Sequence, residues 1–491
     1  MKRTSLTTAV IAGIAGVAGI SNMASAVYLN NDGLGQVLIY PYYTVNAGNT
    51  TLLTVVNTTA QGKAVKVRFL EAYDSREVLD FNLYLSPHDV WTAGVVPVGG
   101  GAGVWTNDNS CTVPTVPSGG AANAYPFQTS AFDGGVTATD GGPTDVSRTL
   151  EGYVELIEMG TVTNATNNSL KAITHGSNGI PANCAQVYGA WNGGYWVPSG
   201  AADIASPTGG LFGSGAIINV SQGTIAGYNA DAIDQFYLAG TTFHTAPGSL
   251  TPSIASATST TSYVFAPSPV SSIPTLVTTT YALGVDAVSS LFMADSLYNE
   301  YWTSGGTAAS SEWVVTFPTK RFYVDPTIVT GPVIADPPFD VVFSSRNGGT
   351  SCSPIGINSY DREEKSPGGT INFSPVKVYG NALCYEAQVV TFNQGTGASK
   401  VLGSNLTANI NPGANNGWVQ IDLYSKAATQ HILPASYTVG SSNVFRGLPA
   451  TGFWVANLVN GNVGGVLSNY SALFRHKLHR TCANTAGSAC S

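Results

Sequence analysis

Several runs of this chain alternate apolar and polar residues with a period of two. Val65, Val67 and Phe69 are separated by Lys66 and Arg68, so apolar side chains recur at every second position. Similar runs occur at 79–85, 313–317 and 419–423. Successive side chains of a β-strand point to opposite faces, so this pattern is typical of antiparallel strands with one buried face. The alternation predicts a mainly β fold.

Five such strands follow one another in the first hundred residues, separated by turn residues. They are predicted at 35–44, 51–57, 64–71, 78–85 and 90–95. Short strands at these intervals are typical of an immunoglobulin-like β-sandwich. A chain of 491 residues is too long for a single hydrophobic core. We therefore expect two immunoglobulin-like β-sandwich domains with long loop insertions and one or two short helices.

The expected domain boundary lies near 330–340, where Pro332, Pro337 and Pro338 interrupt the strand pattern. An N-terminal domain would then cover 27–330 and a C-terminal domain 335–480, followed by a short tail at 481–491. Stretches with few alternating residues are predicted loop insertions of the first domain, at 99–147, 185–215 and 245–280. Apolar residues at helical spacing predict a helix near 283–301.

Residues 1–26 have the three parts of a secretory signal peptide. Lys2 and Arg3 give a positive start, 9–20 is an uncharged apolar run, and a small-x-small sequence ends at Ala26. We expect cleavage after Ala26 and export across the inner membrane. The alternative is an N-terminal membrane anchor, but the apolar run is shorter than the ~20 residues that a spanning helix needs. No later run is long enough, so we expect no transmembrane segment in the mature chain.

The six cysteines of the chain are even in number, and an exported protein matures where thiols oxidise. Pairing the nearest neighbours along the sequence predicts the disulfides Cys111–Cys184, Cys352–Cys384 and Cys482–Cys490. None of the six has a C-x-x-C or Cys/His spacing of the kind that binds zinc. We therefore expect the cysteines to be structural.

The low charge of the chain excludes some partners. The formal net charge is −8, and only 10% of the residues are charged. A mildly acidic chain without a basic tract is a poor partner for nucleic acid. Ser, Thr, Asn and Gly supply the polarity instead, as in the strands and turns of extracellular β-proteins.

The sequence predicts no catalytic residue. It contains no nucleophile elbow and no phosphate-binding loop. Glu71, Asp74 and Glu77 flank a turn beside Arg76, and such mixed clusters are usually ion pairs at the protein surface. We therefore predict surface ion pairs at this turn.

Three aspartates in one Gly-rich loop are candidate calcium ligands: Asp133, Asp140 and Asp145. Calcium prefers several oxygen ligands from a flexible, turn-rich backbone. No EF-hand or nonapeptide spacing supports a calcium site, and Asp-Gly pairs are also favoured in ordinary turns. Both interpretations stay open, and we expect no other cofactor.

Three segments carry a resemblance to known proteins: 36–43 (QVLIYPYY), 75–87 (SREVLDFNLYLSP) and 448–453 (LPATGF). They resemble secreted, surface-type proteins of Gram-negative bacteria that have an immunoglobulin-like β-sandwich texture and no assigned activity. The resemblance runs through most of the mature chain. It implies export and a β-sandwich fold, and it implies no catalytic residues.

Two classes of function are compatible with these features. The first is a secreted or cell-surface structural protein, such as a layer, matrix or adhesion component, that binds other surface proteins, glycans or its own copies without catalysis. The second is a secreted carbohydrate-binding protein or glycan-active enzyme. It would use loop carboxylates and aromatic groups such as Tyr298, Tyr301 and Trp302. The periplasm is the alternative location for both.

Overall fold

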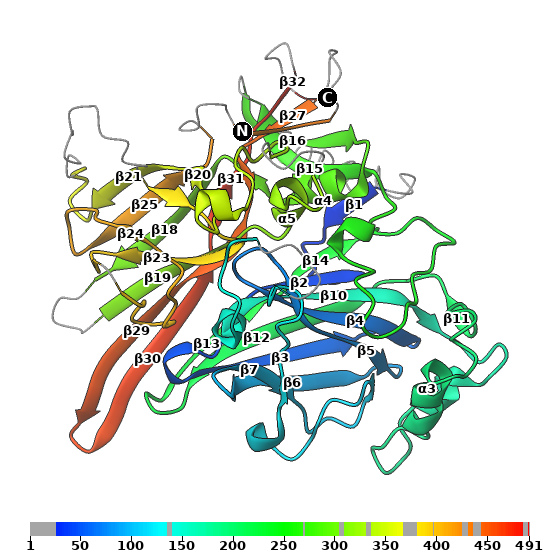
Figure 1. The fold of residues 1–491 in the computed structure, drawn as a ribbon. Helices are drawn as coiled ribbons and strands as arrows, with labels where there is room; N and C mark the ends of the chain where they lie inside the picture. Colours follow the sequence, from blue (N-terminus) through cyan, green and yellow to red (C-terminus); the bar gives the residue numbers. More distant parts are fainter. Residues whose placement is uncertain are drawn as a thin grey trace, which may run out of the picture.

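The computed structural model confirms that the chain is mainly β (Figure 1). It describes residues 26–134, 140–268, 271–303, 309–329, 335–366, 381–395, 397–424, 431–435, 443–484 and 490. The predicted signal peptide lies outside these ranges except for Ala26, the residue at the expected cleavage site. Within the described ranges, no helix combines the length and the apolar character needed to cross a bilayer.

The largest sheet follows the order β16-β15-β1-β14-β2-β10-β4-β5-β8, and β11 pairs beside β10. Its strands are β1 (Ala26–Leu29), β2 (Val37–Thr44), β4 (Gly62–Glu71), β5 (Glu77–Leu85), β8 (Cys111–Val113), β10 (Glu151–Val162), β11 (Ile204–Ala205), β14 (Asp231–Asp234), β15 (Thr261–Ser268) and β16 (Ser271–Thr280). All pairs in this sheet are antiparallel except β1 with β15. The predicted strands at 35–44, 64–71 and 78–85 are confirmed as β2, β4 and β5.

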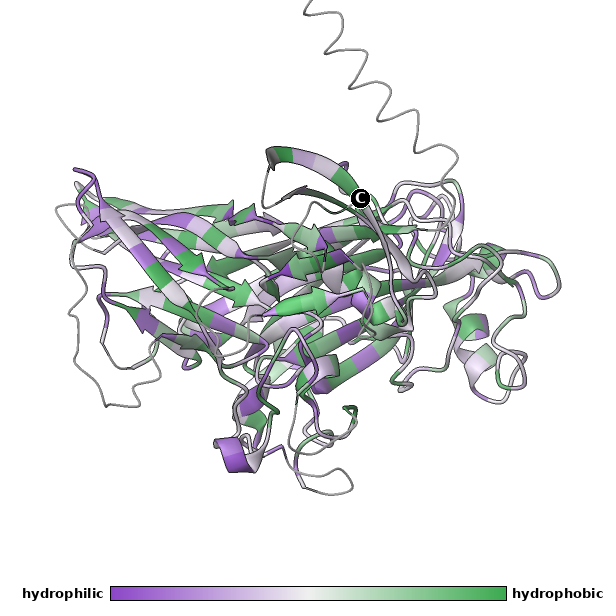
Figure 2. Ribbon diagram, turned by 90° about the horizontal axis from the view of Figure 1, so that it is seen from above, coloured by the Kyte–Doolittle hydropathy of each residue, from purple (hydrophilic) through white to green (hydrophobic). Residues whose placement is uncertain are grey.

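A second sheet lies against the large one, in the order β13-β12-β3-β6-β7-β9 (Figure 1). Its strands are β3 (Asn49–Asn57), β6 (Val90–Val98), β7 (Gly101–Trp105), β9 (Tyr125–Pro126), β12 (Leu211–Asn219) and β13 (Thr224–Asn229). Inward side chains of both sheets form one core, in which Val67 and Phe69 share a cluster with Val55, Trp91 and Val104. This packing explains the period-two alternation, because every second side chain of a strand faces the core. In Figure 2, hydrophobic and hydrophilic segments accordingly alternate along single strands.

Two further sheets contribute to a second core, which also contains Val37, Tyr153 and Ile157 of the large sheet. One is ordered β21-β25-β18-β31 and the other β24-β23-β19-β29-β30. Their strands are β18 (Ser296–Trp302), β19 (Ala309–Thr316), β21 (Gly356–Asp361), β23 (Ala387–Phe392), β24 (Thr407–Ile410), β25 (Asn416–Asp422), β29 (Thr451–Val463), β30 (Val466–Arg475) and β31 (Lys477–His479). Leu297 and Ile421 of the first sheet meet Trp313 and Trp454 of the second. The long β29–β30 hairpin runs down one side of the molecule (Figure 1), and Asn469 of β30 donates to the carbonyl of Gln222 in the turn between β12 and β13 at 2.6 Å.

Strands from both sides of the predicted boundary share these sheets. β18 and β19 precede residue 330, and they pair with β25 and β29, which follow it. Phe453 of β29 also stacks on Tyr228 of the six-stranded sheet, with ring centroids 5.2 Å apart. The expected division at 330–340 therefore does not coincide with a division between sheets, and the number of domains stays a prediction.

Two two-stranded sheets and one three-stranded sheet complete the described fold. They are β17 (Met293–Ala294) with β28 (Leu448–Pro449), β20 (Ser353–Pro354) with β22 (Ala382–Leu383), and β26 (Ile432–Pro434) and β32 (Cys482–Asn484) on either side of β27 (Asn443–Arg446). The predicted tail therefore begins inside a sheet, because β32 starts at Cys482, whose side chain is buried in the second core.

Four short α-helices occur in the described residues, where the sequence predicts one or two. They are α2 (Ser169–Ile173), α3 (Cys184–Trp191), α4 (Gly284–Phe292) and α5 (Arg321–Val324). The predicted helix at 283–301 is right only for α4, because β18 begins at Ser296. Leu297 and Tyr301 are four residues apart, which fits one face of a helix, but both are also buried at alternating positions of a strand.

All three predicted loop insertions contain strands. The stretch 185–215 contains β11 and the first residues of β12. The stretch 245–280 forms the β15–β16 hairpin, in which Val264 pairs with Val277. Its Ser and Thr content suggests a loop, but Thr and Val are also favoured in strands. The stretch 99–147 gives β7 and β9 to the six-stranded sheet and β8 to the large sheet. Val104 of β7 and Tyr125 of β9 line a groove beside β5.

Candidate functional site

The turn between β4 and β5 folds around the carboxylate of Glu71. Glu71 Oε2 accepts a hydrogen bond from the backbone N–H of Tyr73 at 2.7 Å. Oε1 accepts from the N–H groups of Asp74 at 3.1 Å and Arg76 at 2.7 Å. These N–H groups have no strand partner, so a buried carboxylate that accepts all three fixes the path of the turn.

A buried set of ionic side chains, here called the turn cluster, surrounds this turn. Its members come from the turn, from the loop before β10, from α5 and its two caps, and from the residue before β23: Glu71, Asp74, Arg76, Asp140, Arg148, Lys320, Arg321, Asp325 and Glu386. Arg76 Nη2 lies 3.2 Å from both Asp74 Oδ2 and Asp325 Oδ2. Arg321 Nε lies 3.1 Å from Asp325 Oδ2, and the Arg321 side chain is the most exposed of these cations, at 19%.

Burial shifts the pKa of several members of the turn cluster. It raises the pKa of Asp74 well above its usual range, and the negative charge of Asp325 adds to that effect. Burial also raises the pKa of Glu386, although the ammonium of Lys320 opposes the shift. The pKa of Lys320 itself is lowered to about 8 by burial. Such shifts occur at functional sites and in structural ion-pair networks alike, so they mark this region as a candidate and do not assign chemistry.

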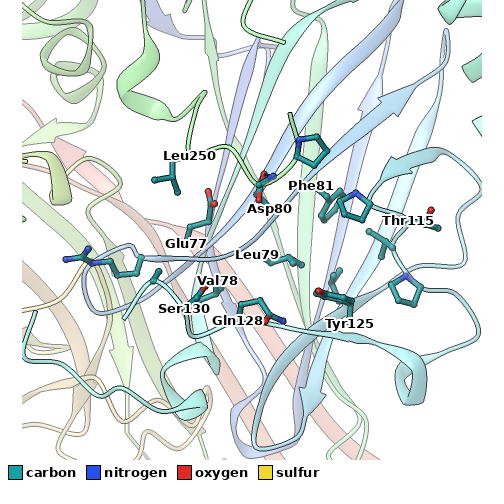
Figure 3. Close-up of a pocket in the computed structure, with 18 of the residues that line it drawn as sticks. Glu77, Val78, Leu79, Asp80, Phe81, Thr115, Tyr125, Gln128, Ser130 and Leu250 are labelled. Atoms are coloured by element: carbon teal, nitrogen blue, oxygen red, sulfur yellow. Dashed lines mark hydrogen bonds between the residues drawn. The ribbon is translucent and has the colours of Figure 1, made fainter. Parts of the chain in front are cut away.

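A groove of about 530 Å³ begins beside the turn cluster, where Arg76 and Arg321 form its end. Its floor is the first half of β5, from Glu77 to Phe81 (Figure 3). One wall is the segment that follows β8, residues 114–117, and another comes from Tyr125, Gln128 and Ser130. Leu250 stands at the rim, from the segment that precedes β15. Most of the lining side chains are apolar, which suits binding more than proton transfer.

The groove exists because β8 covers only part of β5. β8 pairs with Asn82, Leu83 and Tyr84 and ends at Val113. The next residue is Pro114, which has no N–H with which to continue the ladder. At the other end of the groove, Gln128 N–H donates to the carbonyl of Val78 at 2.7 Å. The strand edge between these two contacts faces the groove.

The polar face of β4, β5 and β10 carries buried ion pairs that hold the floor in place. Lys66 Nζ lies 2.7 Å from Asp80 Oδ2, and Arg68 Nε lies 2.6 Å from Glu77 Oε2. The N–H of Gly248 donates to Asp80 Oδ2 at 2.9 Å, which ties the rim segment to the floor. The two carboxylates that line the groove therefore already have cationic partners.

The predicted surface ion pairs at 71–77 are wrong. Glu71, Asp74 and Arg76 are almost fully buried, and Glu77 is largely covered. Oppositely charged side chains next to a turn are usually exposed to solvent, but here α5 and the loop before β10 pack over the turn. The sequence does not show this cover, because Asp140, Arg148 and Asp325 are far from the turn along the chain.

The three candidate calcium ligands have separate protein partners. The carboxylate of Asp140 binds Arg148, with Nη1 at 2.9 Å from Oδ1. Asp145 accepts the N–H of Ser147 at 2.8 Å and caps the 3₁₀ turn Val146–Thr149. Asp133 accepts from the Thr129 hydroxyl at 3.3 Å. Among the described residues, no three His, Cys, Asp or Glu side chains are grouped to hold a metal ion, so the structure gives the calcium hypothesis no support.

The three predicted disulfides are all formed: Cys111–Cys184, Cys352–Cys384 and Cys482–Cys490. The first joins β8 to the start of α3, and it therefore fixes the strand that ends at the groove. Three disulfides indicate that the chain folds outside the reducing cytoplasm.

A second candidate site is a row of aromatic rings on the outer face of the four-stranded sheet. Tyr360 of β21 stacks on Trp418 of β25 with centroids 4.6 Å apart, and Tyr298 of β18 lies 6.5 Å from Trp418. Trp418 is 40% exposed. The amide of Gln420 donates to the Tyr298 hydroxyl at 3.1 Å. Of the predicted aromatic cluster, Tyr298 belongs to this row, Tyr301 is buried in the second core, and Trp302 is half-buried with its ring edge-on to Trp454.

Sequence reasoning misses the groove residues themselves. Val78, Tyr125 and Leu250 come from three separate segments, and no motif connects them. One signal is available, namely that Pro114 and Pro117 follow a very short strand and prevent it from extending. No protein-family model, no curated protein and no solved structure matches this chain.

Proposed function

We propose that this chain is an exported interaction protein that acts at the cell surface or in the extracellular space and holds a partner in the groove beside β5. The observation that carries the proposal is the groove itself, a preformed site of about 530 Å³ with mainly apolar walls. Its floor carboxylates are engaged with Lys66 and Arg68, so binding is the chemistry that it offers.

Export supports the same role. The signal-peptide pattern at 1–26, the low charge and the three disulfides suit a protein that works outside the cytoplasm. The resemblance to surface-type proteins of Gram-negative bacteria and the immunoglobulin-like character of the sheets are part of this proposal. The cell surface is the proposed location, and the periplasm is the alternative.

Location is tested by treating intact cells of the encoding bacterium with protease and by probing the medium, the periplasm and the envelope for the mature chain. We expect cleavage on intact cells or recovery from the medium. Recovery only from the periplasm, protected from protease, would overturn the surface role.

The role of the groove is tested with a purified, labelled mature chain added back to cells that lack it. Ser130 is exposed and lines the groove, so a tryptophan there fills the site without disturbing the core. We expect Ser130→Trp to lose most cell binding, whereas Ser118→Trp, at an exposed position between β8 and β9 that does not line the groove, retains it. Equal binding by both variants would contradict the proposal.

A carbohydrate-binding function is the second candidate, and the row formed by Tyr298, Trp418 and Tyr360 favours it. Aromatic rings beside planar amides are common in sugar sites, because the rings cover the apolar face of a pyranose. Affinity electrophoresis in gels that contain bacterial or plant polysaccharides tests it. The candidate predicts retardation that Trp418→Ala removes and Tyr470→Ala, at an exposed ring of β30, leaves unchanged. No retardation by any polysaccharide would reject it.

A further inference from the structure

The residues that line the floor of the groove are consecutive, which indicates that the floor is the edge of a strand. Every residue from Arg76 to Phe81 borders the cavity. Side chains alternate between the two faces of a sheet, so a groove across a face is lined by every second residue. A groove lined by six residues in a row follows the backbone edge of the strand instead. The groove beside β5 therefore exposes main-chain groups as well as side chains.

The register shows which main-chain groups face the groove. In an antiparallel ladder, the N–H and C=O of one residue point to one neighbouring strand and those of the next residue point to the other. Val78 C=O points toward Gln128, and Asn82 pairs with Val113 of β8. Asp80 lies between Val78 and Asn82, two residues from each, so its main-chain groups point to the same side of the strand as theirs. Its N–H and C=O thus face the groove, and no strand of the described residues pairs with them.

The walls keep this edge open. Pro114 and Pro117 line the groove and have no N–H, and Pro247 at the rim has none either. A strand edge with unpaired N–H and C=O groups is a template for another extended chain, and proteins usually cover such edges. Here the edge lies at the bottom of a cavity with an apolar lining.

We propose that the groove binds an extended polypeptide segment of a partner protein, which adds a short strand to β5 at Asp80. This inference rests on the proposed function and names the class of partner. Main-chain hydrogen bonds to Asp80 would supply an affinity that does not depend on the sequence of the bound segment. The apolar walls would contact every second side chain of that segment. Val116 and Tyr125 provide those walls.

The charges at the groove determine which of its ends would bind an acidic residue of the segment. Arg321 is partly exposed at the end of the groove, whereas its counter-ion Asp325 is fully buried. Glu77 and Asp80 are held by Arg68 and Lys66 on the polar face. Arg321 also donates Nη1 to the Ser75 carbonyl at 2.9 Å, and it borders the groove with the exposed part of its guanidinium. We therefore expect the segment to carry a carboxylate that meets this cation.

The probe for this inference is a fluorescent octapeptide amide that alternates valine and threonine and ends in aspartate. Two control peptides have the same sequence. One is N-methylated at the odd residues and the other at the even residues, so at least one of them lacks the N–H groups that would bond to β5. Fluorescence anisotropy with the mature, disulfide-bonded chain should show binding of the parent. It should also show that one N-methylated peptide binds with an affinity about tenfold or more below that of the parent.

Hydrogen exchange gives a second readout. The parent peptide should slow exchange in the segment that contains β5, and the weaker N-methylated peptide should not. Ser130→Trp should lose peptide binding, while Ser118→Trp should keep it. If both N-methylated peptides bind as tightly as the parent, the groove recognises side chains alone and the strand-addition proposal is overturned.

The two proposals fail in different ways. If no peptide binds but Ser130→Trp still abolishes cell binding, the groove is the interaction site for another class of ligand, and only the strand-addition proposal falls. If the peptide binds and its binding depends on its N–H groups, while the chain stays in the periplasm, the surface role falls and strand addition stands.

Discussion

The guanidinium of Arg148 lies side-on against the carboxylate of Glu71, with Nη2 3.0 Å from Oε1 and Nε 2.9 Å from Oε2. Both side chains are fully buried. Glu71 also accepts the N–H groups of the β4–β5 turn, so the pair connects the loop before β10 to the turn at the end of the groove.

Removal of Arg148 should therefore destabilise the protein strongly. Arg148→Met keeps much of the volume but leaves Glu71 and Asp140 as buried carboxylates without their main cation, which typically costs about 3–5 kcal/mol. Denaturant unfolding of the disulfide-bonded chain measures this cost. Arg346→Met, at an exposed arginine, is the matched control and should leave the midpoint unchanged. Similar midpoints for both variants would show that the pair is not structural.

This pair also shows where sequence reasoning stops. The alternation at 64–71 and 78–85 identifies β4 and β5, and the order of the cysteines gives all three disulfides. Both patterns are local or depend only on chain order. The partners of Glu71 are not local, because Arg148 lies far along the chain, and its burial depends on how the loop before β10 packs.

The second part of the helix predicted at 283–301 is wrong for a related reason, whereas α4 confirms the first part. Leu297 and Tyr301 fit both a helical stripe and a strand, and β25 and β31, which pair with β18, decide the outcome. Tertiary pairing overrides local spacing at such positions. The groove is hidden in the same way, since Val78, Tyr125 and Leu250 meet only in the folded chain.

The disulfides should differ in their contribution to stability. In the loop-entropy description, Cys111–Cys184, which closes a separation of 73 residues, stabilises by about 4 kcal/mol. Cys482–Cys490 closes a separation of 8 residues and contributes about 2.5 kcal/mol. We expect the double alanine variant of the first pair to unfold at a lower denaturant concentration than that of the second. The reverse order would mean that native packing around the sulfurs outweighs chain entropy.

Acid should destabilise the protein through His476. Its Nε2 lies 2.8 Å from the carbonyl of Val314, and its Nδ1 lies 2.8 Å from the Asn299 amide nitrogen. Burial lowers the pKa of His476 to about 4. Between pH 6.5 and about 4 the unfolded chain binds a proton that the folded chain does not, so stability falls as the pH falls through this window, by up to about 3 kcal/mol.

The variant His476→Gln does not titrate, so it should lose less stability than the wild type between pH 7 and pH 4. Urea unfolding at several pH values measures the difference. His88→Asn is the control, because His88 is exposed and asparagine tolerates its left-handed backbone. A parallel pH dependence in wild type and His476→Gln would contradict the prediction. His244, whose pKa burial also lowers to about 4, should act in the same direction.

Glu312 should be a stabilising link between the two cores. Its carboxylate accepts the N–H of Val401 at 2.7 Å and that of Leu402 at 3.0 Å, and the Asn49 amide donates to the Val401 carbonyl at 3.2 Å. Glu312→Ala leaves two buried N–H groups without an acceptor and should cost about 2–4 kcal/mol in denaturant unfolding. Glu300→Ala, at an exposed position of β18, should have little effect. Equal stability of the two variants would show that water replaces the carboxylate.

Leu250 offers a way to separate binding from stability at the groove. Its side chain is 66% exposed at the rim, so folding gains little from it, whereas a bound segment would cover it. Burial of a leucine side chain contributes about 1.5–3 kcal/mol, and partial cover on binding contributes a fraction of that. Leu250→Ser should therefore weaken peptide binding by about three- to tenfold at an unchanged unfolding midpoint. Leu283→Ser, at a leucine that is 60% exposed outside the groove, should bind like the wild type. Equal losses for both variants would mean that the peptide adheres to exposed leucines in general and not to the groove.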